Sequence, residues 1–133
     1  MRKLIFVGIL AALALGGASH AADGGIVGSW RFESIGGAQD FDSGKTSLEV
    51  SPEENISMTI GCNRMTSIPA IEGDNIDFGP VAATRKACPP PLGELEQRLQ
   101  EALAAASNFT IEGDTLQLRD DSGDPVAVLV RSK

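Results

Sequence analysis

The sequence predicts an α+β domain in which a curved antiparallel sheet, or a partial barrel of about seven or eight strands, packs on one main helix. Short segments that alternate apolar and polar residues recur along most of the chain, as expected for strands with one buried face. Glycine-rich turns separate them, and such short connections favour antiparallel pairing. One segment near residue 100 has leucines at helical spacing, so a single helix is available to cover the apolar face.

The first three strands are predicted at residues 26–35, 45–51 and 56–60. In the first, "IVGSWRFESI" alternates and is rich in β-branched and aromatic residues. Residues 36–44 are rich in glycine and aspartate and predict a loop. Residues 52–55 form a turn, so the second and third segments are expected to pair as a hairpin.

Two further hairpins and a last strand follow, over residues 68–79, 109–118 and 125–131. A Gly-Asp pair marks the middle of each hairpin, at 73–74 and 113–114, where a tight turn requires positive φ. The segment between the hairpins, "PVAATRKACPPP", has no clean period and ends in three prolines that lack a backbone donor, which predicts a loop.

The helix is predicted over residues 91–106. Its apolar stripe follows steps of three and four residues, and Pro91 suits the first turn. The stripe consists of Leu92, Leu95, Leu99, Ala102, Leu103 and Ala106. The opposite, solvent-facing side is assigned to Glu94, Glu96, Gln97, Arg98, Gln100 and Glu101.

Residues 1–22 have the pattern of a cleaved secretory signal peptide. Arg2 and Lys3 precede an apolar run over residues 4–15, and small residues surround Ala21 and Ala22, either of which could precede the cut. The run is too short for a bilayer, which needs about 20 apolar residues. No cysteine near the cleavage site offers an attachment point for lipid, so we expect a periplasmic or secreted protein whose single domain covers residues 23–133.

The charge and composition of the mature chain exclude several functions. Arg2 and Lys3 leave with the signal, so 9 of the 11 basic residues remain against 18 acidic ones, and the formal charge falls from −7 to −9. Such an acidic surface disfavours binding to nucleic acid and to anionic membranes. The only histidine, His20, leaves as well, and the chain has no tyrosine. Histidine-based nucleophilic pairs and histidine metal sites are therefore excluded.

Several motifs in this order resemble the META/HslJ domain. They are Gly28 with Trp30, the cluster "GCNR" at 61–64, "TRKACP" at 84–89, Glu96 on the helix and the C-terminal hairpin that ends at Arg131. The resemblance covers nearly the whole mature chain. It implies a small α+β domain with one main helix, in an exported bacterial protein linked with the heat-shock response and novobiocin resistance. It implies no established reaction.

Cys62 and Cys88 are the only cysteines. In an oxidising compartment, two cysteines of a small domain favour a disulfide, and closing this loop contributes about 3 kcal/mol. The bridge would staple the helix N-terminus to the sheet. Buried free thiols remain an alternative, as does a reactive or metal-binding pair. The metal alternative is disfavoured because zinc takes about four ligands and no histidine remains.

Other marked residues have both a binding and a structural interpretation. Asn63 and Arg64 could hold a carboxylate or phosphate, but a local role is favoured, with Asn63 in a turn and Arg64 paired with Glu94 or Glu96. Thr84 and Arg85 bind a ligand or else cap backbone groups of the loop. Trp30 is favoured as a core anchor over a ligand platform.

The acidic run Asp120, Asp121 and Asp124 lacks the final glutamate of an EF-hand calcium loop and instead predicts a hairpin turn.

Two functions remain open from the sequence. The first is a non-catalytic, stress-related envelope module that binds an envelope protein, a peptide or a small ligand at the sheet edge or in a groove beside the helix, with no cofactor. The second is a thiol-redox-responsive envelope protein that uses Cys62 and Cys88. We favour the first.

Overall fold

The computed structural model describes residues 25–132, so the predicted signal peptide lies outside the described part of the chain. Ten strands form one antiparallel sheet in the order β5-β6-β8-β9-β10-β1-β2-β3-β4-β7. The strands are β1 (Gly28–Ile35), β2 (Ser47–Val50), β3 (Ile56–Thr59), β4 (Arg64–Ser67), β5 (Ala70–Glu72), β6 (Asn75–Asp77), β7 (Ala82–Ala83), β8 (Asn108–Glu112), β9 (Thr115–Arg119) and β10 (Pro125–Arg131). The helices are the short 3₁₀ turn η1 (Ser43–Lys45) and α2 (Leu92–Ala105).

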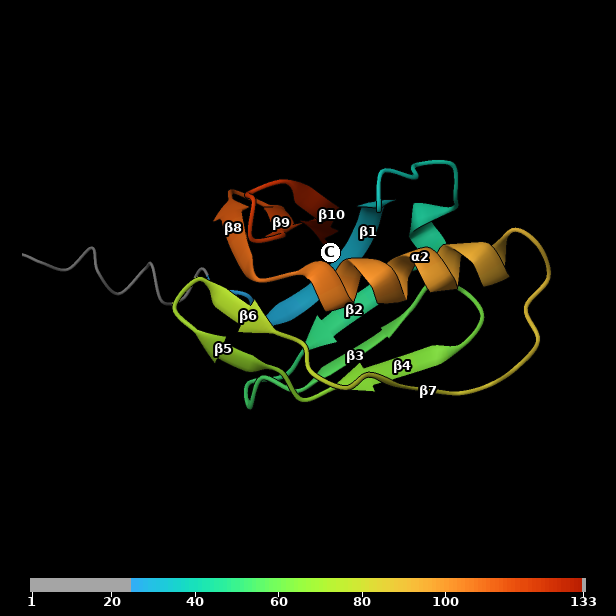
Figure 1. Cartoon of the computed structure of the whole chain (residues 1–133), viewed down its shortest axis with the longest axis horizontal. Coiled ribbons are helices and arrows are strands. Elements are labelled where there is room, and N and C mark those ends of the chain that lie inside the picture. The colour runs from blue at the N-terminus through green and yellow to red at the C-terminus, as the bar shows by residue number, and fades with distance from the viewer. Residues whose placement is uncertain (1–24, 133) are drawn as a thin grey trace, which may run out of the picture.

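The sheet curls into a half-barrel around α2. Figure 1 shows the helix between the β8–β10 side of the sheet and the β2–β4 side, with β1 joining them. Strands β1 and β10 bring the two ends of the described chain together, with Trp30 opposite Arg131. The predicted fold class is confirmed, with ten strands in place of seven or eight, because the sequence did not predict β4 and β7.

The predicted Gly-Asp hairpin turns are present. Two-residue connections join β5 to β6 and β8 to β9. Gly73 and Gly113 have φ of 60° and 61°, and the aspartate that follows each of them has negative φ. Positive φ costs glycine little because it has no Cβ, so one glycine in each turn is enough for the chain to reverse its direction.

The core lies between the concave face of the sheet and the apolar stripe of α2. Leu95, Leu99 and Leu103 are 8%, 0% and 1% exposed, as the helical spacing predicted. Opposite them lie buried side chains from β1 and β10, including Phe32 and Leu129. An amphipathic helix gains most of its stability from such packing rather than from its own propensity.

Among residues 25–132, no helix is long and apolar enough to cross a membrane.

Candidate functional site

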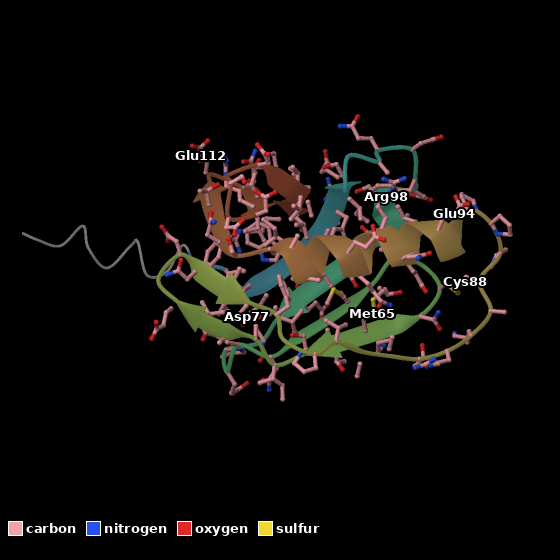
Figure 2. The ribbon with its side chains drawn as sticks, in the orientation of Figure 1. Met65, Asp77, Cys88, Glu94, Arg98 and Glu112 are labelled. Atoms are coloured by element: carbon pink, nitrogen blue, oxygen red, sulfur yellow. A yellow bond between two sulfur atoms is a disulfide. The ribbon has the colours of Figure 1, made fainter. Side chains whose placement is uncertain are left out.

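Cys62 and Cys88 are bonded to each other, with their Cα atoms 6.0 Å apart. Cys62 follows β3, whereas Cys88 lies on the strap, the segment of residues 84–91 that leads from β7 into α2. Figure 2 labels Cys88 on this strap, close to the end of α2 that carries Glu94. The bridge therefore ties the entry of the helix to the sheet, as the sequence suggested. Both cysteines are half-buried.

Asn63, the residue after Cys62, joins the sheet, the strap and the helix. Its backbone N donates to Oε2 of Glu96 at 2.7 Å, and its Nδ2 donates to Oε1 of the same carboxylate at 2.8 Å. Its Oδ1 accepts from the Thr84 hydroxyl and from the backbone N of Lys86, both at 2.8 Å. Nδ2 also lies 3.2 Å from the Lys86 carbonyl oxygen and 3.2 Å from Sγ of Cys88.

The prediction that Glu96 faces solvent is wrong. Glu96 is only 8% exposed, because Asn63 satisfies both oxygens of the carboxylate beneath the strap. Burying a carboxylate is costly unless hydrogen bonds replace its water shell. Two short bonds from one residue provide that replacement.

The predicted pairing of Arg64 with a helix glutamate is also wrong. Arg64 begins β4, is exposed, and donates from Nη1 to the Ser57 hydroxyl at 3.0 Å on the outer face of the sheet. The backbone N of Arg64 donates to the Thr84 hydroxyl at 3.0 Å. Thr84 therefore caps a backbone group of β4 rather than one of its own loop, while its neighbour Arg85 is exposed.

Trp30 is fully buried, in keeping with the predicted role of a core anchor. Its Nε1 donates to the Ile26 carbonyl at 2.9 Å. The Arg131 guanidinium lies 4.1 Å from the centre of the ring, a cation–π contact that joins the first and last strands of the described chain.

The acidic run at 120–124 is a turn, as predicted. Oδ1 of Asp120 accepts from the backbone N of Ser122 and of Asp124, each at 3.0 Å.

A cluster of three groups with metal-ligand chemistry lies beside Asn63. The two sulfurs and a carboxylate oxygen of Glu96 are all within 4.8 Å of one another. Oε1 of Glu96 is 3.6 Å from Sγ of Cys88. As a disulfide, the sulfurs are neutral and weak acceptors, but as thiols they could donate to the carboxylate or bind a soft metal ion.

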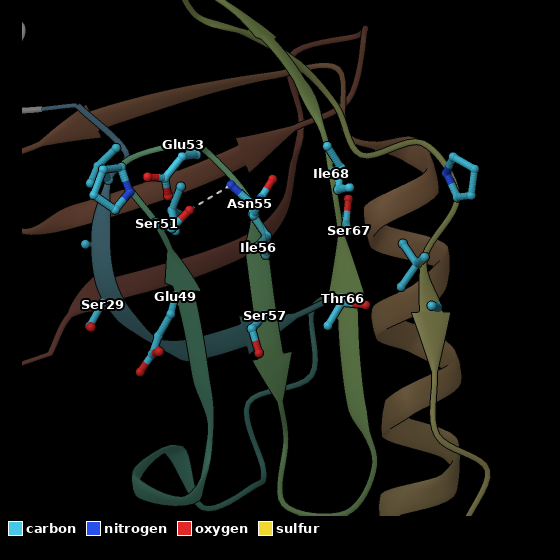
Figure 3. A pocket seen from close by; sticks show the side chains of 17 residues that line it. Ser29, Glu49, Ser51, Glu53, Asn55, Ile56, Ser57, Thr66, Ser67 and Ile68 are labelled. Atoms are coloured by element: carbon cyan, nitrogen blue, oxygen red, sulfur yellow. Dashed lines mark hydrogen bonds between the residues drawn. The ribbon is translucent and has the colours of Figure 1, made fainter.

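The second candidate region is a groove of about 1020 Å³ on the outer face of the β2–β4 part of the sheet. Figure 3 shows Glu49, Ser57 and Thr66 on these strands, with α2 at the right of the view. The segment from Pro80 to Ala82 forms one wall, and the start of β1 with Val27 forms another. The sequence predicted binding at the sheet edge or in a groove beside the helix, whereas this groove lies on the face of the sheet that points away from the helix.

The groove contains the two large apolar side chains that are most exposed among the described residues. Ile68 is 81% exposed and Val27 is 41% exposed. The charged residues in its lining are Glu49 and Glu53, and none of its lining residues is basic. Sequence reasoning missed this site because Ile68 fits the alternation of a predicted strand, and alternation alone does not reveal which apolar residues stay uncovered.

We predict that Asn63→Ala lowers the free energy of unfolding by about 2–4 kcal/mol, because it removes the partner of Oε1 of Glu96, of the Thr84 hydroxyl and of the Lys86 backbone, while the backbone bond to Oε2 remains. Urea unfolding of the oxidised protein measures this change. Asn55→Ala, at an exposed turn, is the matched control and should change stability by less than about 0.5 kcal/mol. Equal stability of the two variants would contradict the role given to Asn63.

Comparison with known proteins places this geometry in a family. An NMR structure of a protein from Burkholderia xenovorans is 23% identical with a TM-score of 0.65, over 92% of this chain and 94% of that one. A second NMR structure is 19% identical with a TM-score of 0.59, over 78% and 88%. A crystal structure of a DUF4847 family protein from Bacteroides vulgatus is 13% identical with a TM-score of 0.52, over 68% and 62%.

These likenesses to solved structures concern the fold alone. No curated protein matches the chain. The META domain family model matches residues 25–133, which include every strand and helix described above. The chain therefore belongs to the META domain family.

Proposed function

We propose that the protein is a non-catalytic, exported envelope module related to stress, and that it binds an extended polypeptide segment in the groove on its outer face. The observation that carries this proposal is the open apolar groove around Ile68. Exposed apolar patches with a polar rim mark interaction sites in soluble domains. The lack of histidine and tyrosine after residue 22 supports a binding role over a catalytic one.

The chemistry of the groove favours a partner that is apolar and basic. The charged residues of its lining, Glu49 and Glu53, are both acidic, Arg64 adjoins the lining at the Ser57 hydroxyl, and the chain without its predicted signal carries a formal charge of −9. Complementary charge raises the association rate and sets the orientation of a bound segment.

The shape of the groove favours an extended segment. One wall leads into β7, a strand of only two residues at the end of the sheet, which pairs with β4 at Met65–Ala83 and Thr66–Ala82. β7 pairs with only two of the four residues of β4, and an extended peptide can add to backbone groups that an edge leaves free. An extended segment that pairs there could place alternate side chains against Ile68.

We predict that Ile68→Ser weakens binding of a synthetic eight-residue peptide that alternates leucine and lysine by about 10- to 100-fold, because burying an isoleucine contributes roughly 1.5–3 kcal/mol. Fluorescence anisotropy of the labelled peptide gives the affinity. Ile68 is 81% exposed, so the substitution should leave the fold intact.

Two controls distinguish binding in the groove from nonspecific binding of the peptide. Gln100→Ser, on the exposed side of α2, should bind the peptide as the wild type does. A peptide with glutamate in place of lysine should bind more weakly, owing to Glu49 and Glu53. Equal affinity of Ile68→Ser and wild type would remove the groove from the proposal.

Export is part of the same proposal. A disulfide is compatible with an oxidising compartment outside the cytoplasm. We predict that protein recovered from the envelope or the medium begins at Ala22 or Asp23, since small residues precede both cuts. Intact-mass measurement of the recovered chain checks this, and a full-length mass would count against a cleaved signal.

A second candidate function, response to thiol redox state, is favoured by the surroundings of the disulfide. The sulfurs are half-buried, and Asn63 and Glu96 hold the strap and helix together beside them by bonds that do not involve the disulfide. A dithiol can transfer two electrons and two protons to the bridge, becoming a disulfide itself while Cys62 and Cys88 become thiols.

We predict that a dithiol releases two thiols per chain from the folded protein without loss of the sheet or the helix. The bridge contributes about 3 kcal/mol, which is less than the usual stability of a domain of this size. A thiol-reactive dye counts the sulfurs, and circular dichroism follows the fold. Reaction that occurs only together with unfolding would make the bridge purely structural.

A further inference from the structure

The cluster of Cys62, Cys88 and Glu96 has the composition of a zinc site once the bridge is opened. Zinc is bound by thiolate sulfur at about 2.3 Å and by carboxylate oxygen at about 2.0–2.2 Å, usually with tetrahedral geometry. All three ligand atoms already lie within 4.8 Å of one another. The sequence disfavoured a metal because zinc takes about four ligands and no histidine remains, whereas the fold adds a carboxylate from the first half of α2.

The distances fit such a coordination shell. In a tetrahedron with those bond lengths, a sulfur and an oxygen ligand are separated by about 3.6 Å and two sulfurs by about 3.8 Å. Oε1 of Glu96 is 3.6 Å from Sγ of Cys88. The Lys86 carbonyl oxygen, 3.5 Å from the same sulfur, is placed for a fourth position. The rearrangement required is the separation of the two sulfurs.

Asn63 already holds the groups that would act as ligands. Its Nδ2 donates to Glu96 and lies 3.2 Å from Sγ of Cys88, while Thr84 and Lys86 fix its Oδ1. Hydrogen bonds from surrounding residues orient metal ligands and typically account for a 10–100-fold difference in affinity. A carboxylate oxygen has two lone pairs, so Oε1 can accept from Asn63 and still bind a cation.

We propose that the reduced protein binds one Zn²⁺ through Cys62, Cys88 and Glu96, and that oxidation abolishes the site. This inference rests on the second candidate function, a reducible bridge. A dithiol supplies two electrons and two protons to open the disulfide and is itself oxidised to a disulfide. Zn²⁺ then displaces one proton from each thiol as the two zinc–sulfur bonds form. A small-molecule disulfide reverses the reaction: it takes two electrons from the thiolates and is reduced to two thiolates of its own, while the Cys62–Cys88 bond re-forms and the ion is released.

The test compares the same chain in its two redox states. The protein is reduced with a phosphine, which is oxidised to its oxide and then removed without air. The thiols are counted, and Zn²⁺ is titrated in competition with a chromophoric chelator. The reduced wild type should bind one Zn²⁺ per chain, and the oxidised wild type should bind at least 100-fold more weakly. Glu96→Gln should weaken binding by at least tenfold, whereas Glu94→Gln, an exposed residue of the same helix, should change it less than twofold.

A second measurement uses only the wild type, so it tests the proposal even if the Glu96→Gln variant does not fold. Co²⁺ added to the reduced wild type should give sulfur-to-cobalt charge-transfer absorption and the visible bands of a tetrahedral site. Absence of both overturns the proposal, as does equal Zn²⁺ binding by the reduced wild type and the Cys62→Ser/Cys88→Ser variant. Two free thiols in a folded chain without zinc binding overturn the metal site alone. If thiols are released only when the protein unfolds, both this proposal and the redox candidate are overturned. The proposal that the groove binds a peptide does not depend on this result.

Discussion

The contact between Asn63 and Glu96 is the interaction on which the arrangement of the domain depends. A half-barrel leaves its concave face open, and α2 must be held there at a fixed angle for its leucines to reach the core. Packing of the leucines supplies most of the stability of the helix, and directional polar bonds add a constraint on its orientation. The paired bonds from the backbone N and Nδ2 of Asn63 to one carboxylate set both the position and the rotation of the first half of the helix.

Asn63 also explains why the strap is ordered without the regular hydrogen bonds of a strand or a helix. Asn63 bonds to the Lys86 backbone at both N and O, and Thr84 bonds to Asn63 and to the backbone of Arg64. The carbonyls of Pro89 and Pro91 accept from the start of α2. Buried backbone groups need partners, and an asparagine supplies a donor and an acceptor together. The disulfide then adds a covalent constraint to a segment that hydrogen bonds already position.

Features encoded by local periodicity could be predicted from the sequence. The helix, the Gly-Asp hairpins and the inward leucines follow from spacing alone. The strand β4 could not, because it contains one buried apolar residue, Met65, and its outer partner β7 is two residues long within a proline-rich segment. The sequence predicted that Glu96 faces solvent because a charged residue on a helix is normally exposed. Its burial depends on Asn63, which lies 33 residues away in the chain and gives no local signal.

The groove and the sulfur cluster occupy different faces but share one continuous segment. Residues 80–82 line the groove, β7 pairs with β4, and the chain then passes Thr84 and reaches Cys88 before α2 begins. Thr84 bonds to Asn63 on one side and to the first residue of β4 on the other. The side-chain hydrogen bonds between Cys88 and the groove wall therefore converge on Asn63 and Thr84, the two residues that link these regions.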